Sequence, residues 1–234
     1  MKNIVRQSAR NETGAANAKS LAGRSNRRTE VRIVRGLDDL LMVYSIRASV
    51  YMAEQDCPFV EEFDGNDHCA THFIGFIRGE PAGCLRARFF SDFVKLERLA
   101  VRKSFRRSTL AFDLVRAGID FAQRKGFTRF YGHSREGLDP FWARFGAKPL
   151  SDRETFVFSD YRYTEMVLDL EPIADPISLK SKPMVILRPE GDWDRPGVLE
   201  ASSGRMPRRP TKNSVTTRLS IASPRQDENV KDVA

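Results

Sequence analysis

The sequence has few cysteines and no long apolar stretch. Its three cysteines, Cys57, Cys69 and Cys84, form no CxxC pair. An odd set of this kind argues against a disulfide scaffold and favours a reducing compartment. No apolar run approaches the ~20 residues that span a bilayer, and the N-terminus lacks the apolar stretch of a secretory signal. These absences predict a cytoplasmic protein without a membrane span.

The net charge of the middle of the chain, residues 31–170, is close to zero. The sequence holds 39 Lys and Arg against 31 Asp and Glu, a formal charge of +8. Residues 1–30 hold 7 basic and 2 acidic side chains and residues 171–234 hold 11 and 9, whereas residues 31–170 hold 21 and 20. Because the middle is nearly neutral, it lacks the basic surface of a nucleic-acid-binding domain, and we expect no nucleic-acid partner. Such a partner would depend on the arginines of the two ends alone.

Composition divides the chain into four segments. Residues 1–30, rich in Asn, Ser, Arg and Gly, predict a disordered basic arm, and residues 31–170 predict the folded domain. Residues 171–200 are rich in proline and carry one dense apolar patch, Pro183–Leu187, which we expect to pack on the domain as an edge segment. Residues 201–234 predict a disordered tail.

Hydrophobic periodicity in the folded domain alternates between two types. Alternation with period two predicts strands at 31–35, 70–78, 82–90, 94–101, 127–132, 154–158 and 161–170. Helical spacing predicts helices at 37–54, 108–125 and 139–145. The first helix is expected to bury the stripe Leu40, Leu41, Tyr44, Ala48 and Tyr51. This order predicts an α/β (α+β) fold in which a mixed sheet is flanked by helices.

Three segments within this order carry a resemblance to a known family. They are Leu96–Val101 (LERLAV), Phe105–Ala111 (FRRSTLA) and Phe141–Ala147 (FWARFGA). Together they resemble the GNAT superfamily of N-acyltransferases, as its central strand, its pyrophosphate-binding loop and its closing helix. In that family the central strand separates from its neighbour and admits the pantetheine of an acyl thioester. The resemblance implies acetyl-CoA or acyl-CoA as co-substrate and no metal.

The pyrophosphate segment departs from the family pattern R-x-x-G-x-G/A. A loop that opens a helix offers unpaired N–H groups and a positive dipole end, and glycine lets the backbone approach phosphate closely. Arg106 takes the leading position, but Thr109 replaces the first glycine. The expected donor-binding residues are Leu99, Val101, Arg106, Arg107, Ser108, Thr109 and Ala111. A plain basic helix start on a solvated face is the alternative.

The resemblance also suggests catalytic groups on the central strand. The family often keeps a glutamate or serine there, so Glu97 is the candidate base, although a one-residue slip would turn it away from the cleft. The backbone N–H of Val101 is the candidate donor to the thioester oxygen. The general acid is unassigned because Trp142 stands where the family has tyrosine, and an indole N–H is no useful acid. Tyr51 and Tyr131 are nearby in sequence only.

An acidic segment predicts the acceptor side. Residues 54–67 contain six carboxylates and no basic residue, a composition that attracts a cationic amine. The segment resembles both a group of bacterial acetyltransferases and the acyl-homoserine-lactone synthases. In the pattern of the second branch, the substrate-binding residues would be Arg47, Glu62, Asp64, Asp67 and Arg86. A solvated acidic loop is the alternative.

These observations lead to an N-acyltransferase as the first hypothesis, acting on the primary amine of a small molecule. A synthase of N-acyl amino acids or homoserine lactones that depends on acyl carrier protein is the alternative, since the lost glycine and the extra arginines suit a docking patch. A non-catalytic binding module with the same fold is the second alternative. His68, Cys69 and His72 lack metal-ligand spacing, so no metal site is expected.

Overall fold

The computed structural model describes residues 29–208. The predicted arm lies outside the described residues up to residue 28, and the predicted tail lies outside them from residue 209. The described residues up to Asp194 belong to one compact unit. Residues 195–208 belong to a second unit, in which a helical turn, α8 (Glu200–Ser203), forms within the segment that we expected to be disordered.

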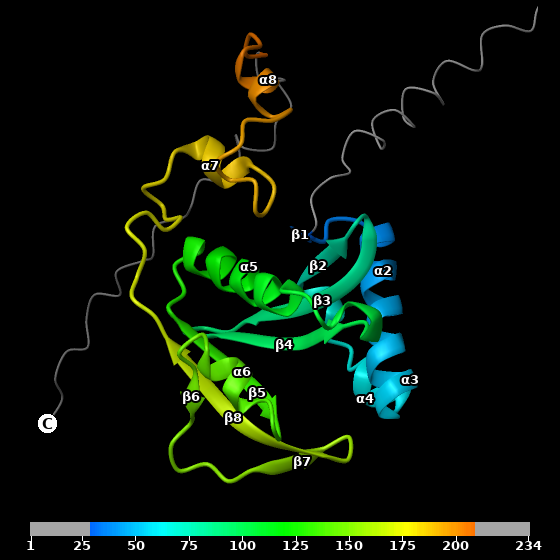
Figure 1. Cartoon of the computed structure of the whole chain (residues 1–234). Helices are drawn as coiled ribbons and strands as arrows, with labels where there is room; N and C mark the ends of the chain where they lie inside the picture. The colour runs from blue at the N-terminus through cyan, green and yellow to red at the C-terminus, as the bar shows by residue number, and fades with distance from the viewer. Residues whose placement is uncertain (1–28, 209–234) are drawn as a thin grey trace, which may run out of the picture. The chain divides into compact units, whose positions relative to one another are not determined.

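An eight-stranded sheet organises the first unit (Figure 1). Its order is β1-β2-β3-β4-β5-β8-β6, with β7 paired to β8. The strands are β1 (Thr29–Ile33), β2 (Thr71–Ile77), β3 (Glu80–Phe89), β4 (Val94–Val101), β5 (Arg129–Arg135), β6 (Lys148–Pro149), β7 (Phe156–Phe158) and β8 (Tyr161–Asp169). Every pairing is antiparallel except that of β4 with β5. The predicted mixed sheet with flanking helices is confirmed.

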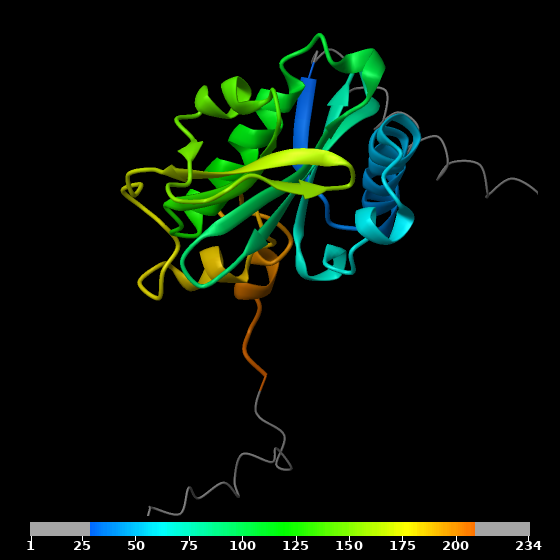
Figure 2. The same cartoon turned by 90° about the horizontal axis from the view of Figure 1, so that it is seen from below.

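Helices cover both faces of the central strands. They are α2 (Leu37–Arg47), the π-helical turn η1 (Ala48–Met52), α3 (Ala53–Gln55), α4 (Phe59–Glu62), α5 (Leu110–Arg124), α6 (Asp139–Ala143) and α7 (Pro183–Leu187), with 3-10 turns η2 (Asp67–Cys69) and η3 (Lys103–Phe105). Ile46 of α2 packs with Ile74 of β2, and Leu114 of α5 packs with Phe73 of the same strand. Because side chains alternate along a strand, α2 and α5 lie on opposite faces, as Figure 2 shows from below.

The first helix buries a different face from the predicted one. Its buried residues are Val43, Ile46 and Arg47, followed by Val50 in η1, whereas Leu41 is 52% exposed. The apolar spacing is therefore misleading here. The helix carries apolar residues on two neighbouring faces, and the inner face is the one with Val43, Ile46 and Val50, together with the fully buried Arg47.

The segment after β8 lies against the domain. The Trp193 ring stacks on Phe121 of α5 with centroids 4.9 Å apart, and Val185 of α7 packs against the same core. Arg35 also pairs with Asp192 at 2.6 Å. The expected packing of Pro183–Leu187 on the domain is found at Val185, although these residues form the helical turn α7 and not an edge segment. Pro183 starts that turn, where its missing N–H costs nothing.

The sheet separates between β4 and β5. These strands pair only at Val94 with Phe130 and at Lys95 with Tyr131. On its other side β4 pairs with β3 and carries a β-bulge. Between the pairs Cys84–Ala100 and Arg86–Glu97, β3 has one residue and β4 has two. Arg98, within this bulge, has a φ of 53°. A bulge bends its strand and increases the local twist, so it accounts for β4 leaving β5.

Candidate active site

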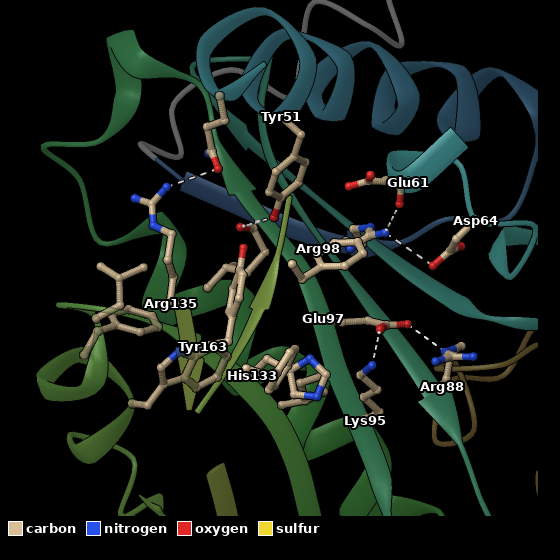
Figure 3. A pocket seen from close by; sticks show the side chains of 18 of the residues that line it. Tyr51, Glu61, Asp64, Arg88, Lys95, Glu97, Arg98, His133, Arg135 and Tyr163 are labelled. Carbon is tan, nitrogen blue, oxygen red and sulfur yellow. Dashed lines mark hydrogen bonds and ion pairs between the residues drawn. The ribbon is translucent and has the colours of Figure 1, made fainter. Parts of the chain in front are cut away.

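A cavity of about 510 Å³ occupies the place where β4 leaves β5 (Figure 3). Strand β4 lines it from Lys95 to Leu99, and β5 lines it with His133 and Arg135. Its charged lining residues are Glu61, Asp64, Arg88, Lys95, Glu97, Arg98 and Arg135. Its aromatic and histidine lining residues are Tyr51, His133, Phe141, Trp142, Phe156, Phe158 and Tyr163. A cavity of this size, polar at one wall and aromatic at another, suits a small organic ligand.

Glu97 faces this cavity, and cations surround its carboxylate. The carboxylate lies 2.7 Å from Arg88 and 3.0 Å from Lys95 (Figure 3). It also lies 2.8 Å from Arg86. Burial raises the pKa of Glu97, but the charges of these cations outweigh burial and hold the pKa below its usual value. A carboxylate stabilised in this way is a weak proton acceptor. Its role as general base stays a prediction, and the geometry does not favour it.

The five residues predicted to bind substrate come together in one ion-pair network. Arg47 binds Glu62 and Asp67, each at 2.5 Å, and Arg86 binds Asp67 at 2.9 Å and Asp64 at 2.7 Å. The side chains of both arginines are fully buried. Burial raises the pKa of Asp67, but the two arginines outweigh it and hold the pKa below its usual value.

The network changes the interpretation of four of these residues. Only Asp64 lines the cavity, while Arg47, Glu62, Asp67 and Arg86 are buried and bind one another. These four residues do not line the cavity, because their charges are paired with one another beneath it, so their role in binding substrate stays a prediction that the geometry does not favour. They hold the acidic segment and β3 in place beneath the site.

Arg98 joins the acidic segment to the central strand. Its guanidinium donates to the Glu61 carbonyl at 2.7 Å and lies 3.3 Å from the Asp64 carboxylate (Figure 3). The left-handed backbone of the bulge sets the direction of this side chain. The sequence offered no pattern that predicts such a bulge, so this contact was not expected.

The free edge of β4 carries backbone groups that the sequence singled out. The N–H of Arg102 donates to Ala82 on β3 at 2.9 Å. Since N–H groups alternate along a strand, that of Val101 points away from β3, toward the gap. The Val101 carbonyl accepts a bond from Arg106 at 3.0 Å, and the Leu99 carbonyl accepts one from the Tyr51 hydroxyl at 2.8 Å.

The loop before α5 combines cations with a helix N-terminus. Arg107 and Lys103 are exposed there, and Ala111 keeps the first turn compact. This donor set fits a diphosphate. Two carboxylates oppose the binding of a diphosphate, because Arg106 is paired with Glu54 at 2.5 Å and Thr109 donates to Asp113 at 2.8 Å. Ser108 accepts from the N–H of Leu110 and thus occupies one of the free donors of the helix start.

Strands β5 and β8 supply cavity residues of which the sequence indicated only one. His133 was expected to end a strand beside the cleft, where it could relay protons or be a hydrogen-bonded structural histidine, and it does line the cavity. Arg135 and Tyr163 were not expected there, since β5 was predicted to end at Gly132 and Tyr163 comes from the β7–β8 hairpin. The alternation of Tyr131, His133 and Arg135 was the available signal. Within residues 29–208, no group of three or more His, Cys, Asp or Glu side chains could hold a metal ion, and no helix is long and apolar enough to cross a membrane.

Comparisons with known proteins agree with this geometry. Residues 40–147 match the family model described as Acetyltransferase (GNAT) family. A Bacillus subtilis (strain 168) protein named as a candidate acetyltransferase is 28% identical over 125 residues, which cover 52% of this chain and 85% of that protein.

Two solved structures share the fold at lower identity. An N-acetyltransferase candidate from Lactobacillus plantarum superposes with a TM-score of 0.57 and 18% identity, over 62% of this chain and all of that one. FeeM, an N-acyl amino acid synthase from uncultured soil microbes, superposes with a TM-score of 0.53 and 13% identity, over 62% and 92%. At these identities the likeness concerns the fold alone.

Proposed function

We propose that the chain is an N-acyltransferase that moves an acetyl or other acyl group from acetyl-CoA or acyl-CoA to the primary amine of a small molecule, since residues 40–147 match the acetyltransferase (GNAT) family model. The observation that carries the proposal is the gap between β4 and β5, where a strand edge faces a cavity of about 510 Å³. A free strand edge offers hydrogen bonds to an extended, amide-containing chain such as pantetheine.

The groups around the gap divide the work of the reaction. The N–H of Val101 would donate to the pantetheine or to the thioester oxygen as negative charge develops there. Arg107 and the start of α5 would hold the diphosphate. On the other side, Asp64 and Glu61 line the cavity and would attract the acceptor amine.

Turnover with defined amines tests the proposal. The full chain is incubated with acetyl-CoA and a panel of small primary amines, and thiol release and the mass of the product are followed. We expect thiol release that depends on one class of amine, together with a product heavier by one acetyl group. Saturable binding of acetyl-CoA without thiol release from any amine would instead indicate the non-catalytic binding module.

A donor held by acyl carrier protein is the second candidate. The observation that favours it is that carboxylates already face the loop before α5. Glu54 neutralises Arg106, and Asp113 places a negative charge at the start of α5. A carrier protein needs a basic docking patch and no adenosine diphosphate site. Parallel calorimetric titrations with acetyl-CoA and with a long-chain acyl carrier protein separate the two, and saturable binding of acetyl-CoA alone excludes the carrier protein.

Freeing Arg106 should strengthen binding of acetyl-CoA. In Glu54→Gln the guanidinium loses its ion-pair partner and becomes available to the diphosphate. A surface charge interaction of 0.5–1 kcal/mol corresponds to an affinity gain of about two- to fivefold. Calorimetry measures the gain, with Asp92→Asn in the β3–β4 turn as the matched control. Equal affinities for both variants would show that the diphosphate does not bind at Arg106.

A further inference from the structure

A line of three polar side chains leads from β8 to the cavity. Tyr131 and His133 alternate on β5, and Glu165 lies opposite His133 on β8. The Tyr131 hydroxyl donates to the Glu165 carboxylate and lies 2.8 Å from His133 Nε2. Only His133 of the three lines the cavity.

These contacts decide the tautomer of His133. A tyrosine hydroxyl has one hydrogen, and that hydrogen is given to Glu165. The bond between Tyr131 and His133 therefore requires Nε2 to be the donor. Nδ1 then carries the lone pair, and none of the described residues donates a hydrogen bond to it.

The surroundings of the ring keep it neutral and fixed. Phe156 packs edge-on against it at 4.8 Å and Tyr131 at 5.2 Å. Burial and the charge of Lys95 lower the pKa of His133 to about 4, with Arg98 acting in the same sense and Glu165 and Glu97 against it. The imidazole is thus uncharged at neutral pH.

We propose that His133 carries a proton from the acceptor nitrogen to the leaving sulfur. The inference rests on the proposed function. As the amine nitrogen bonds to the thioester carbon, it becomes cationic, and Nδ1 takes one of its protons. When the carbon–sulfur bond breaks, the imidazolium returns that proton to the thiolate. The amide and the free thiol leave, and His133 is neutral again.

Three other cavity groups are less suited to this role. Glu97 is held by three cations and Asp64 by Arg86 and Arg98, so both are weak proton acceptors. Trp142 has no ionisable proton of useful acidity. None of the described residues bonds to Nδ1 of His133, so its lone pair is open to the amine although the pKa of the ring is low, and the imidazolium is a strong enough acid to protonate a thiolate readily.

Nuclear magnetic resonance tests the tautomer without any turnover. The chain has three histidines, so nitrogen-labelled full-length protein gives three ring spin systems, and that of His133 is assigned with His133→Gln. We expect His133 at pH 7 to be neutral with the proton on Nε2, and Tyr131→Phe to weaken that preference. A proton on Nδ1, or a charged ring at pH 7, would overturn the proposal.

Kinetics then test the proton transfer. Using acetyl-CoA and the amine that the wild type acylates fastest, we expect His133→Ala to lower kcat by about 100-fold or more while the Kd for acetyl-CoA stays unchanged. Added imidazole should restore part of the rate. Tyr131→Phe, which affects only the positioning of the ring, should lower kcat by less and leave KM unchanged.

The control is His68→Ala, which changes an exposed histidine outside the cavity and should turn over like the wild type. A His133→Ala variant with wild-type kcat overturns this inference and leaves the acyltransferase intact. A wild type that neither binds acetyl-CoA nor acylates any amine refutes the proposed function itself, whereas the tautomer measured by resonance is independent of it.

Discussion

Replacing Arg86 with methionine will lower the thermal unfolding midpoint by roughly 10 °C. Removing one partner of a buried ion pair costs about 3–5 kcal/mol of folding free energy. Each kcal/mol shifts the midpoint of a chain of this length by about 2–4 °C. The side chain is fully buried and binds Asp64, Asp67 and Glu97. Methionine fills most of the volume but leaves these carboxylates without their central cation. Differential scanning calorimetry of the full chain measures the midpoint.

The matched control is Arg129→Met, which breaks an exposed ion pair with Asp169 and should leave the midpoint close to that of the wild type. Adding Asp67→Asn to Arg86→Met should recover part of the loss, because one of the uncompensated charges is then removed. Equal midpoints for Arg86→Met and Arg129→Met would show that the buried network does not support the fold.

A proline at position 101 should separate fold from function. The N–H of Val101 faces the gap and takes no part in the β3–β4 ladder, so Val101→Pro should keep the sheet. It removes the proposed donor to the thioester, and loss of such a donor lowers kcat by about 100-fold or more. Circular dichroism and steady-state kinetics with acetyl-CoA measure the two effects.

The neighbouring position provides the control. Ala100 is paired with Cys84 and its N–H points toward β3, so Ala100→Pro removes a bond of the central ladder and should prevent folding. If Val101→Pro folds and turns over at the wild-type rate, the free edge of β4 takes no part in catalysis.

The central strand and the long helix were predictable because their apolar positions repeat with a clear period. Strand β4 runs from Val94 to Val101 as predicted, and α5 differs by two residues at its start and one at its end. Both pack their apolar positions into one core, so periodicity alone determines them. The same signal failed on β5, because His133 and Arg135 face a polar cavity and their part of the strand reads as a loop.

The roles of charged residues were less predictable than their identities. Arg47, Asp67 and Arg86 were singled out by a family pattern, yet whether they contact substrate or one another depends on burial. Arg47 binds partners that lie 15 and 20 residues further along the chain, because the chain turns back toward it through η1 and α4. No local pattern shows such a contact.

Titration of acetyl-CoA into the full-length protein by calorimetry tests the central claim most directly. If the gap between β4 and β5 holds the acyl thioester, binding saturates at one molecule per chain, and Val101→Pro weakens it while Asp92→Asn does not. Binding that is equal in the wild type and Val101→Pro, or no binding of acetyl-CoA at millimolar concentration, would contradict that claim.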